Sequence, residues 1–486
     1  MRVVETERAF EGANPNQSNA HQSMTLFPHG NRARRFRAPP AVARTRGRGH
    51  ISGAMSSRFS LGRLALPLLG LAAIVLVAAA LRRPRLAPPR HSDRPLCAAG
   101  NAGLALPGGL CALAVAKGLG PVRHLVVAPN GVVFVNAGSR GVLALRDTSG
   151  DGVADIVRPF GGPGGTGIAL GDRYLYYSTD DAVYRYAWKP GQLEPAGAPE
   201  AVVTGLPSNG DHTSKSIALG PGGALFVNVG SATNSCQERN RSSRSRGRDP
   251  CTELETRAGI WRFAADRPGQ RFADGEHWAT GLRNTVALAV DPASGALYGA
   301  VHGRDQLADN WGFTAQRSAE NPAEEFVRIG RGEDFGWPYC YYDVDARAKV
   351  LAPEYGGDGT RIGRCATARA PLTAFPGHWG PMALAFGPAP QLGAGYESGV
   401  FVAFHGSWNR APLPQAGYRV IWQPLRDGVP AGDYRTVVTG AGGPTSIRPS
   451  GLAMGPDGSL YVAADANGTI WRILGDSSTA HTREDK

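Results

Sequence analysis

The sequence lacks three cofactor motifs that mark common enzyme classes. It has no Gly-x-Gly-x-x-Gly before a helical segment, so nicotinamide chemistry is unsupported. It has no Cys-x-x-Cys-His, so a c-type haem would have to sit on a partner, and no Cys-x-x-Cys, which argues against zinc. No long segment shows the 3.6-residue period of an amphipathic helix. With 66 glycines and 37 prolines between short apolar segments, the chain instead suits many short strands joined by tight turns.

Net charge is also missing from most of the chain, although the formal total is +12. Residues 1–90 hold 15 arginines, no lysine and three acidic residues, which accounts for the whole excess. The remainder has 37 basic and 37 acidic residues and is neutral. A folded part without net charge carries no electrostatic signal for DNA or RNA. We therefore expect no nucleic-acid partner.

One apolar run, from Leu64 to Leu81, lies between arginines near the start of the chain. About 18 apolar residues with positive flanks fit a secretory signal or a single membrane anchor, and both remain open for residues 61–85, with a buried helix as a third alternative. Residues 1–60 are expected to be a disordered basic leader, with Met55 as a plausible start. These features predict an extracytoplasmic protein, periplasmic or secreted, that contacts a membrane only through this segment.

The six cysteines form three pairs that are close in sequence: Cys97 with Cys111, Cys236 with Cys251, and Cys340 with Cys365. An even number of cysteines behind an export signal predicts disulfides formed in an oxidising compartment. The alternative is six reduced thiols in a cytosolic protein. The first pair falls in residues 86–122, which we expect to be a linker, and residues 476–486 are expected to be a disordered tail.

One pattern recurs along the rest of the chain: alternating apolar residues, a turn with Pro or Gly, and a second alternating arm with an aromatic residue. The six copies are Leu125–Val135, Gly167–Tyr177, Ile217–Val227, Leu288–Tyr298, Leu384–Phe404 and Leu452–Val462. Alternation on both arms of a Pro-x-Gly turn is typical of a β-hairpin. Six such hairpins predict an all-β fold, a six-bladed β-propeller over residues 123–475, whereas a two-sheet sandwich would not explain the repetition.

Polar residues stand directly before three of these hairpins. Residues 211–216 precede the third copy, residues 280–285 precede the fourth, and residues 446–450 precede the last. Propellers place their ligand sites at the mouth of the central channel, in loops that lead into or out of each innermost strand. We therefore expect these segments to meet at one mouth and to carry the chemistry.

Four motifs in and near these segments resemble the pyrroloquinoline quinone (PQQ)-dependent soluble glucose and sorbosone dehydrogenases. Asp211-His212 before an Ile-Ala-Leu-Gly-Pro strand looks like that family's catalytic-histidine segment, and Arg283-Asn284 is similar to its cofactor segment. Residues 302–305, His-Gly-Arg-Asp, look like its calcium loop, and residues 335–338, Phe-Gly-Trp-Pro, resemble its Tyr-Gly-Trp-Pro turn. The four follow the family's order at positions that a propeller allows.

The resemblance implies a role for each matching residue, where the plainer alternatives are loop salt bridges and turn caps. His212 would be the general base that removes a hydroxyl proton from a sugar, while hydride passes to the quinone. Ca²⁺ held by the backbone carbonyls of Gly303 and Arg304 would polarise the quinone, and Arg283 would stabilise the developing negative oxygen. The residues expected to bind the cofactor are Asn284, Arg448, His405 and Arg410.

The chain departs from the family pattern at two places. Near the second repeat, where the family often has Gln or His, it has Gly164-Gly-Thr166-Gly167, and Ser450 stands where a second arginine would follow Arg448. The Gly-Arg-Asp calcium loop is also closer to the sorbosone branch than to the glucose branch. These departures predict a lower affinity for the cofactor or a different substrate.

Two further segments lie outside the resemblance. Side-chain oxygens occupy positions 1, 3, 5 and 9 of a calcium-loop pattern at Asp147, Ser149, Asp151 and Asp155. Arg158 stands at position 12 in place of Glu, so a second Ca²⁺ site and a plain Asp-Gly turn are both open. Residues 237–250 contain five arginines and are expected to be a mobile solvated loop or a docking surface for an anionic substrate or electron acceptor.

Together these features predict an exported or anchored PQQ- and Ca²⁺-dependent oxidoreductase. It would oxidise an aldose or a related sugar or aldehyde and pass electrons to a respiratory acceptor, a quinone or a cytochrome. One alternative is a non-enzymatic carbohydrate- or protein-binding propeller that kept the scaffold. Another is a lactonase-type hydrolase, which would need several inward Asp, Glu or Asn ligands, where this chain offers histidine and arginine.

Overall fold

The structure, a computed structural model, describes residues 97–443 and 445–476. The predicted leader (residues 1–60), the predicted signal or anchor (residues 61–85) and nearly all of the predicted tail lie outside these residues. None of the helices in the described part of the chain is both long and apolar enough to cross a membrane.

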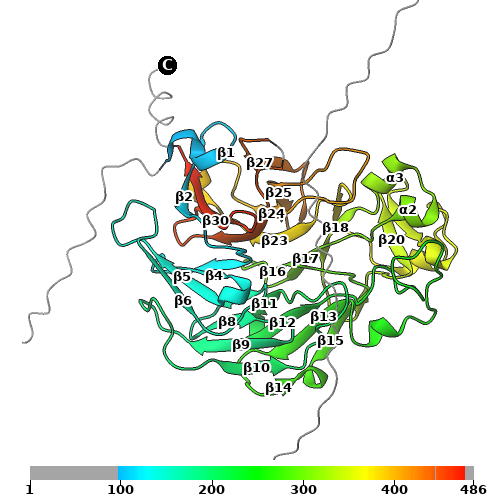
Figure 1. Cartoon of the computed structure of the whole chain (residues 1–486), viewed down its shortest axis with the longest axis horizontal. Helices are drawn as coiled ribbons and strands as arrows, with labels where there is room; N and C mark the ends of the chain where they lie inside the picture. The colour runs from blue at the N-terminus through cyan, green and yellow to red at the C-terminus, as the bar shows by residue number, and fades with distance from the viewer. Residues whose placement is uncertain (1–96, 444, 477–486) are drawn as a thin grey trace, which may run out of the picture. The chain divides into compact units, whose positions relative to one another are not determined.

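Six sheets follow one another around a common centre (Figure 1). The first contains β3 (Leu125–Val127), β4 (Val133–Asn136), β5 (Val142–Arg146) and β6 (Ile156–Phe160). The second contains β7 (Ile168–Leu170), β8 (Tyr174–Ser178), β9 (Ala182–Ala187), β10 (Glu200–Thr204) and β14 (Gln270–Arg271). The third contains β11 (Ile217–Gly220), β12 (Ala224–Val229), β13 (Gly259–Ala264), β15 (Glu276–Thr280) and β19 (Glu333–Asp334).

The remaining three sheets complete the ring. The fourth contains β16 (Ala287–Val290), β17 (Leu297–Val301), β18 (Glu324–Arg328) and β22 (Thr373–Phe375). The fifth contains β23 (Pro381–Phe386), β24 (Gly399–Phe404), β25 (Arg419–Arg426), β26 (Val429–Pro430), β27 (Arg435–Gly440) and β1 (Leu104–Ala105). The sixth contains β28 (Pro449–Met454), β29 (Leu460–Ala464), β30 (Thr469–Gly475) and β2 (Leu110–Ala116). The two innermost strands of every sheet are one of the predicted hairpins, so the six-bladed β-propeller is confirmed.

The third hairpin shows why the repeated pattern forms this unit. Strand β11 pairs with β12 in antiparallel register, from Ile217 opposite Val227 to Gly220 opposite Ala224. The turn between them places Gly222 and Gly223 at φ values of 66° and 71°, a left-handed conformation that glycine adopts without strain. All six residues of β12 are buried, because the second strand of a blade packs against a neighbouring blade on each face.

The hydrophobic core lies between the sheets. Within the described residues, six clusters of buried apolar side chains join each sheet to the next, and the sixth sheet to the first. The inner strands β3, β7, β11, β16, β23 and β28 line a central channel of about 250 Å³. Because every sheet packs against two neighbours, the loops that lead to the inner strands are held around one axis.

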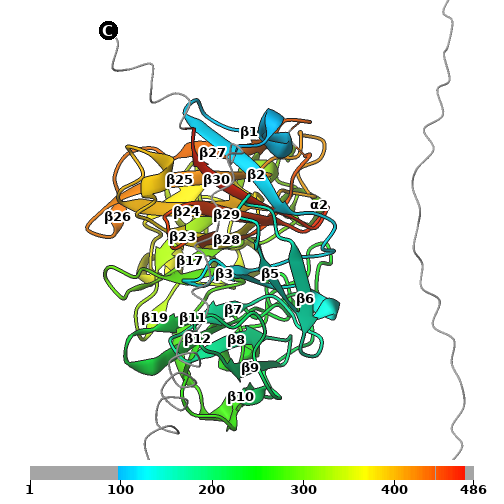
Figure 2. The same ribbon diagram turned by 90° about the vertical axis from the view of Figure 1, so that its left-hand side faces the viewer.

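Two N-terminal strands close the ring. Strand β2 pairs antiparallel with β30, with Leu110 opposite Gly475, and β1 pairs with β27 (Figure 2). The expectation that residues 86–122 are a linker is therefore wrong for this stretch, since both strands are outer strands of propeller blades. The repeat could not indicate them because neither belongs to a hairpin of its own.

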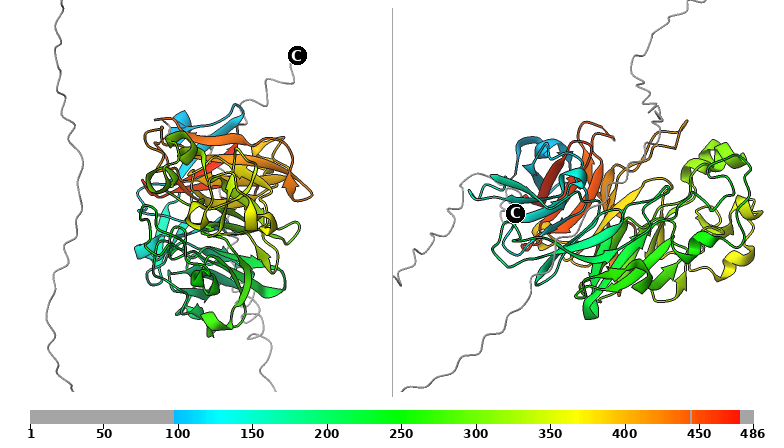
Figure 3. Two further views of the ribbon diagram at one scale, coloured as in Figure 1. Left: turned by 90° about the vertical axis from the view of Figure 1, so that its right-hand side faces the viewer. Right: turned by 60° about the horizontal axis from the view of Figure 1, so that its bottom comes forward.

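An insertion made of the segments between β17 and β18 and between β18 and β22 of the fourth blade stands at one edge of the ring (Figure 3). It contains α2 (Leu307–Trp311), α3 (Ala315–Glu320) and a hairpin of β20 (Cys340–Asp343) with β21 (Ala348–Leu351). The disulfides Cys236–Cys251 and Cys340–Cys365 lie in or beside it, and Cys97–Cys111 ties β2 to the residues before it. All three predicted pairings are confirmed.

Ring closure by β2 yields a stability prediction. Leu113 is buried in the cluster between the sixth and first blades. Leu113→Ala should lower the free energy of unfolding by about 2–5 kcal/mol, the usual cost of truncating a packed leucine. Urea denaturation would measure this, with Val429→Ala, at an exposed position of β26, as the control that changes little. An unchanged midpoint in Leu113→Ala would show that β2 does not contribute to the fold in solution.

Candidate active site

A cavity of about 370 Å³ lies where the loops before and after the inner strands meet. Its lining includes five of the predicted site residues: His212, Arg283, Gly303, His405 and Arg448. They come from the loops before β11, β16 and β28 and from the loops after β17 and β24. The sequence-based expectation that these segments converge is met by the structure.

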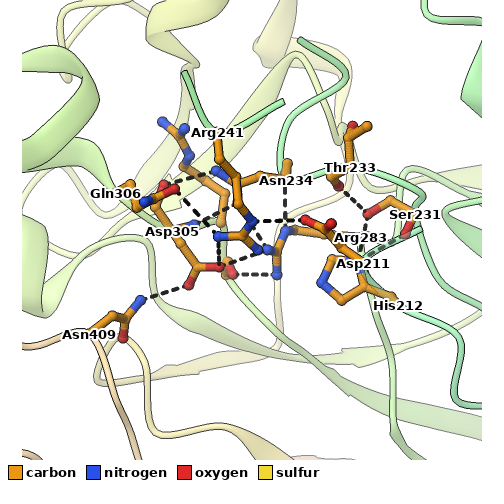
Figure 4. Close-up of polar contacts among 12 residues, drawn as sticks. Asp211, His212, Ser231, Thr233, Asn234, Arg241, Arg283, Asp305, Gln306 and Asn409 are labelled. Carbon is orange, nitrogen blue, oxygen red and sulfur yellow. Dashed lines mark hydrogen bonds and ion pairs between the residues drawn. The ribbon is translucent and has the colours of Figure 1, made fainter. Parts of the chain in front are cut away.

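His212 is held in one orientation and one tautomer. Its Nδ1 lies 2.9 Å from the backbone oxygen of Ser231 and 3.0 Å from the Ser231 hydroxyl, which itself donates to the Thr233 carbonyl (Figure 4). A backbone carbonyl can only accept, so Nδ1 carries the proton and Nε2 is left as an acceptor. Burial, and then the positive charge of Arg283, hold the pKa of His212 well below its ordinary value. The imidazole is therefore neutral near pH 7 and can accept a proton.

Arg283 is buried, and its guanidinium is fixed by three groups. Nη2 lies 3.0 Å from Asp305 Oδ2 and donates to Asn234 Oδ1 at 2.9 Å, and Nη1 donates to the Gly303 carbonyl at 2.8 Å. Neither Asp305 nor Asn234 was assigned a role from the sequence, although Asp305 stands in the motif of residues 302–305. The cation is thus presented to the cavity in a single position.

Asp305 joins three segments of the chain (Figure 4). Besides Arg283, Arg241 Nη1 lies 3.0 Å from Asp305 Oδ2, and Asn409 Nδ2 donates to Oδ1 at 2.7 Å. Burial opposes ionisation of this carboxyl, but Arg283, His378 and Arg241 outweigh it and hold the pKa of Asp305 below its usual range. The carboxylate is therefore charged at neutral pH, and both of its oxygens have partners.

The arginine-rich loop of residues 237–250 is anchored at its first turn. Arg241 pairs with Asp211 at 2.9 Å as well as with Asp305, and its side chain lines the cavity. The expectation of a mobile solvated loop therefore does not hold for Arg241. The other four arginines of the loop, at positions 239, 244, 246 and 248, are exposed.

A second polar chain crosses the cavity mouth. Arg448 Nη2 lies 3.2 Å from His405 Nδ1, and His405 Nε2 lies 2.9 Å from Asp465 Oδ2. An arginine can only donate, so His405 Nδ1 accepts and its Nε2–H donates to the carboxylate. Arg123 binds the same carboxylate at 3.0 Å. His405 and Arg448 therefore form one unit at the mouth, and no sequence motif indicated Asp465.

Glu324 is a cavity residue that no sequence motif indicated. Its Oε2 accepts from the backbone N–H of Gly303 at 3.1 Å and its Oε1 from that of Gly380 at 3.2 Å. Burial raises the pKa of this carboxyl to about 8, because the two hydrogen bonds do not fully replace water. Its position at the start of β18 does not indicate a cavity residue, because a Glu at the start of a strand usually faces solvent.

Three predicted residues have side chains outside the cavity lining. The Asn284 side chain accepts from Asn228 Nδ2 at 3.3 Å, and the buried Arg304 pairs with Glu354 at 2.6 Å. Arg410 donates to the Gly377 carbonyl at 3.0 Å and pairs with Glu320 at 2.6 Å. These contacts hold backbone segments in place, and a direct cofactor contact by Asn284 or Arg410 stays a prediction.

In the loop of residues 147–155, the carboxylates of Asp147 and Asp155 accept hydrogen bonds from backbone N–H groups of the same loop. Asp147 accepts from the backbone N–H groups of Gly150 and Gly152, both at 2.7 Å, and Asp155 accepts from that of Thr148 at 2.6 Å. Within the described residues, no cluster of three or more His, Cys, Asp or Glu side chains has the arrangement of a metal site. A second Ca²⁺ site at Asp147, Ser149, Asp151 and Asp155 stays a prediction.

The fold and the histidine- and arginine-lined cavity are consistent with the propeller dehydrogenases that the sequence motifs indicate. A family model described as TrAA12-like matches residues 104–476. The chain belongs to this family, within the PQQ-dependent sugar dehydrogenases.

Individual relatives agree with this assignment. A PQQ-dependent pyranose dehydrogenase of Coprinopsis cinerea is 29% identical over 236 residues, which span 40% of this chain and 30% of that protein. The PQQ-dependent sugar dehydrogenase of Hypocrea jecorina is 23% identical over 387 residues, 74% of this chain and 86% of that protein.

Solved structures show the same fold. The calcium structure of the Trichoderma reesei family AA12 enzyme has a TM-score of 0.65 at 20% identity and covers 77% of this chain and 97% of that chain. The holo form of the PQQ domain of Coprinopsis cinerea pyranose dehydrogenase has a TM-score of 0.63 at 21% identity, covering 76% and 97%.

The shared carboxylate generates a prediction. Asp305→Ala should lower the free energy of unfolding by about 3–5 kcal/mol, because it leaves the buried Arg283 cation without its partner. Denaturant unfolding would measure the loss, with Asp433→Ala, at an exposed position, as the control. A loss below about 1 kcal/mol would show that Asp305 does not hold Arg283 in solution.

Proposed function

We propose that this protein is a PQQ-dependent dehydrogenase that oxidises an aldose at the carbon carrying its anomeric hydroxyl. The observation that carries the proposal is the neutral, tautomer-fixed His212 in the same cavity as the buried cation Arg283. A base and a fixed positive charge are what removal of a hydroxyl proton and stabilisation of the resulting oxygen require. The names of the curated relatives support sugars as the substrate class.

The cavity offers arginines and a volume that suit PQQ, and Asp211 and Asp305 pair with two of these arginines. PQQ carries three carboxylates, and three arginines line the cavity, Arg241, Arg283 and Arg448. Guanidinium groups suit carboxylates because they donate two parallel hydrogen bonds. The volume of about 370 Å³ lies in the range of small-molecule sites. Bound PQQ would supply the acceptor for the hydride that leaves the substrate carbon.

The residues of this chain would handle the proton. His212 Nε2 would accept the hydroxyl proton, while the hydrogen bond from Nδ1 to Ser231 keeps the ring in place. Arg283 would stabilise the oxygen that loses the proton, and it disfavours the protonated imidazole because both would be positive. His212 therefore does not retain the proton, which favours its release before the next turnover.

Calcium at the Gly303 and Arg304 carbonyls is part of the proposal. Gly303, unlike Arg304, lines the cavity, and its carbonyl accepts one hydrogen bond from Arg283, so one lone pair is left. Because Ca²⁺ takes six to eight oxygen ligands, the cofactor and water would have to supply most of them. The calcium structure of the Trichoderma reesei enzyme supports a role for the ion in this fold.

We also propose an extracytoplasmic location and a respiratory electron acceptor, a quinone or a cytochrome. Three disulfides support the location, because such bonds persist in oxidising compartments. An electron acceptor is needed because each oxidised sugar releases two electrons. Membrane attachment through residues 61–85 stays a prediction.

Reconstitution tests the function. Apo-protein with added PQQ and Ca²⁺ should take up PQQ and reduce a dye with aldoses, and His212→Gln should lower kcat/KM by about 10²–10⁴-fold while still binding PQQ. His277→Gln is the matched control, because His277 stacks on Trp261 in an outer blade strand. The absence of both PQQ uptake and turnover would contradict the dehydrogenase assignment. Full activity in His212→Gln would remove only the assignment of the base.

The pH dependence follows from the environment of His212. The protonated imidazole cannot act as a base, so activity falls when the pH drops below its pKa. Because that pKa is held well below 6.5, the fall in kcat/KM that His212 causes should begin only below pH 6.5, apart from any change near pH 8, where Glu324 titrates. A pH profile of the free enzyme's kcat/KM would measure this. An acid limb centred at or above pH 6.5 would contradict a neutral, desolvated His212.

A further inference from the structure

Trp408 is unusually exposed for its size. The residue is 69% accessible, against 43–45% for the other exposed large hydrophobic residues in the described part of the chain, Val153, Ile362 and Val429. It also lines the cavity that contains His212 and Arg283. Since burying apolar area stabilises a protein by about 25 cal/mol per Å², an indole left in water at a ligand site indicates a surface that a ligand covers.

The backbone on both sides of Trp408 is fixed. On one side, the Ser407 hydroxyl donates to Gln415 Oε1 at 2.7 Å, and the Tyr418 hydroxyl donates to the Ser407 carbonyl at 2.5 Å. On the other side, Asn409 binds Asp305 at 2.7 Å and Arg410 pairs with Glu320 at 2.6 Å. The ring is therefore exposed on a loop that is held at each neighbouring residue. A platform with little backbone freedom loses little entropy when a ligand covers it.

The remaining lining of the cavity is chemically different. Apart from glycines, Trp408 and Met382 are its only apolar residues, and Met382 is buried. Asp211 and Arg241 line the same cavity, with 22% and 29% of their side chains exposed. A pyranose ring has the complementary pattern, with C–H groups on its faces and hydroxyl groups around its rim. An aromatic face beside a carboxylate and a guanidinium can meet both parts.

We propose that Trp408 stacks on the face of the pyranose ring and sets the preference of this site for cyclic over open-chain sugars. The inference rests on the proposed function and extends it to the substrate-binding subsite. Asp211 would accept from a rim hydroxyl, and chemistry would remain with His212. Trp408 therefore contributes to substrate binding and leaves the reacting atoms to other residues.

Steady-state kinetics of the PQQ-loaded enzyme test the inference. Trp408→Ala should raise the KM for D-glucose about tenfold and leave kcat within about twofold, and Trp408→Phe should fall between it and the wild type. Methyl α-D-glucopyranoside keeps the ring but has no free anomeric hydroxyl, so its inhibition constant should rise by the same factor. The inhibition constant of open-chain sorbitol, which has no ring to stack, should not change. Val429→Ala, an exposed apolar truncation outside the cavity, should leave every constant unchanged.

Separate readouts distinguish the possible failures. PQQ affinity, followed by absorbance titration, should be the same in the wild type and in Trp408→Ala, and a large loss would show that the indole covers the cofactor and overturn the inference. An unchanged KM for glucose with PQQ bound would also overturn it. If the wild type turns over no sugar, the proposed function fails, and the subsite is then judged by calorimetric titration of methyl α-D-glucopyranoside. It survives only if the wild type binds the glycoside at least about fivefold more tightly than Trp408→Ala.

Discussion

The contact between Asp305 and Arg283 is the interaction on which the rest of the site depends. Removing two charges from water costs several kcal/mol for each ion and is offset only when the geometry is good and the remaining hydrogen bonds are made. Here the carboxylate meets Arg283 and Arg241 on Oδ2 and Asn409 on Oδ1. The loop before β16, the disulfide-closed loop between Cys236 and Cys251 and the loop after β24 are thereby tied to one side chain. A shift in any of them would move Arg283, the cation whose charge lowers the pKa of the candidate base.

The ring supplies the rigid frame for this cluster through hydroxyl groups between blades. Ser178 donates to the Lys215 carbonyl at 2.6 Å, Ser216 to that of Val286 at 2.5 Å, and Ser450 to that of Val122 at 2.8 Å. Each acceptor stands just before the inner strand of the next blade. These bonds therefore hold the loops at the cavity mouth at set distances from one another. Their donors are buried, so water does not compete for them.

The sequence could indicate structure formed by neighbouring residues, but it could not indicate contacts between residues that are far apart in the chain. Each propeller hairpin is a short pattern with its own turn, and the loops that bring His212 and Arg283 together stand directly before two of them. The pairing of β2 with β30 joins Leu110 to Gly475, and no local pattern specifies such a partner. The same limit applies to Arg241 and Asp305, which are 64 positions apart. Asn284 and Arg410 show a further limit, because neighbours of cavity residues can point their side chains elsewhere.

The two departures from the family pattern explain why the loop between Cys236 and Cys251 matters for this site. Ser450 is fully buried and its hydroxyl binds the Val122 carbonyl, so this position has no room for an arginine. At Gly164 an added Cβ would lie 2.4 Å from Asn136 Oδ1, so a side chain at this position would require Asn136 to move.

The three cations of the cavity therefore come from elsewhere: Arg448 from the last blade, Arg283 from the fourth and Arg241 from the disulfide-closed loop between Cys236 and Cys251. A closed loop restricts the conformations of the unfolded chain and, in the folded protein, limits how far Arg241 can move. Loops outside the repeated hairpins differ most freely between propellers, because the blades do not depend on them. Ligand choice in this chain should accordingly depend on Arg241 and on the loop after β24, while the blades determine where those groups meet.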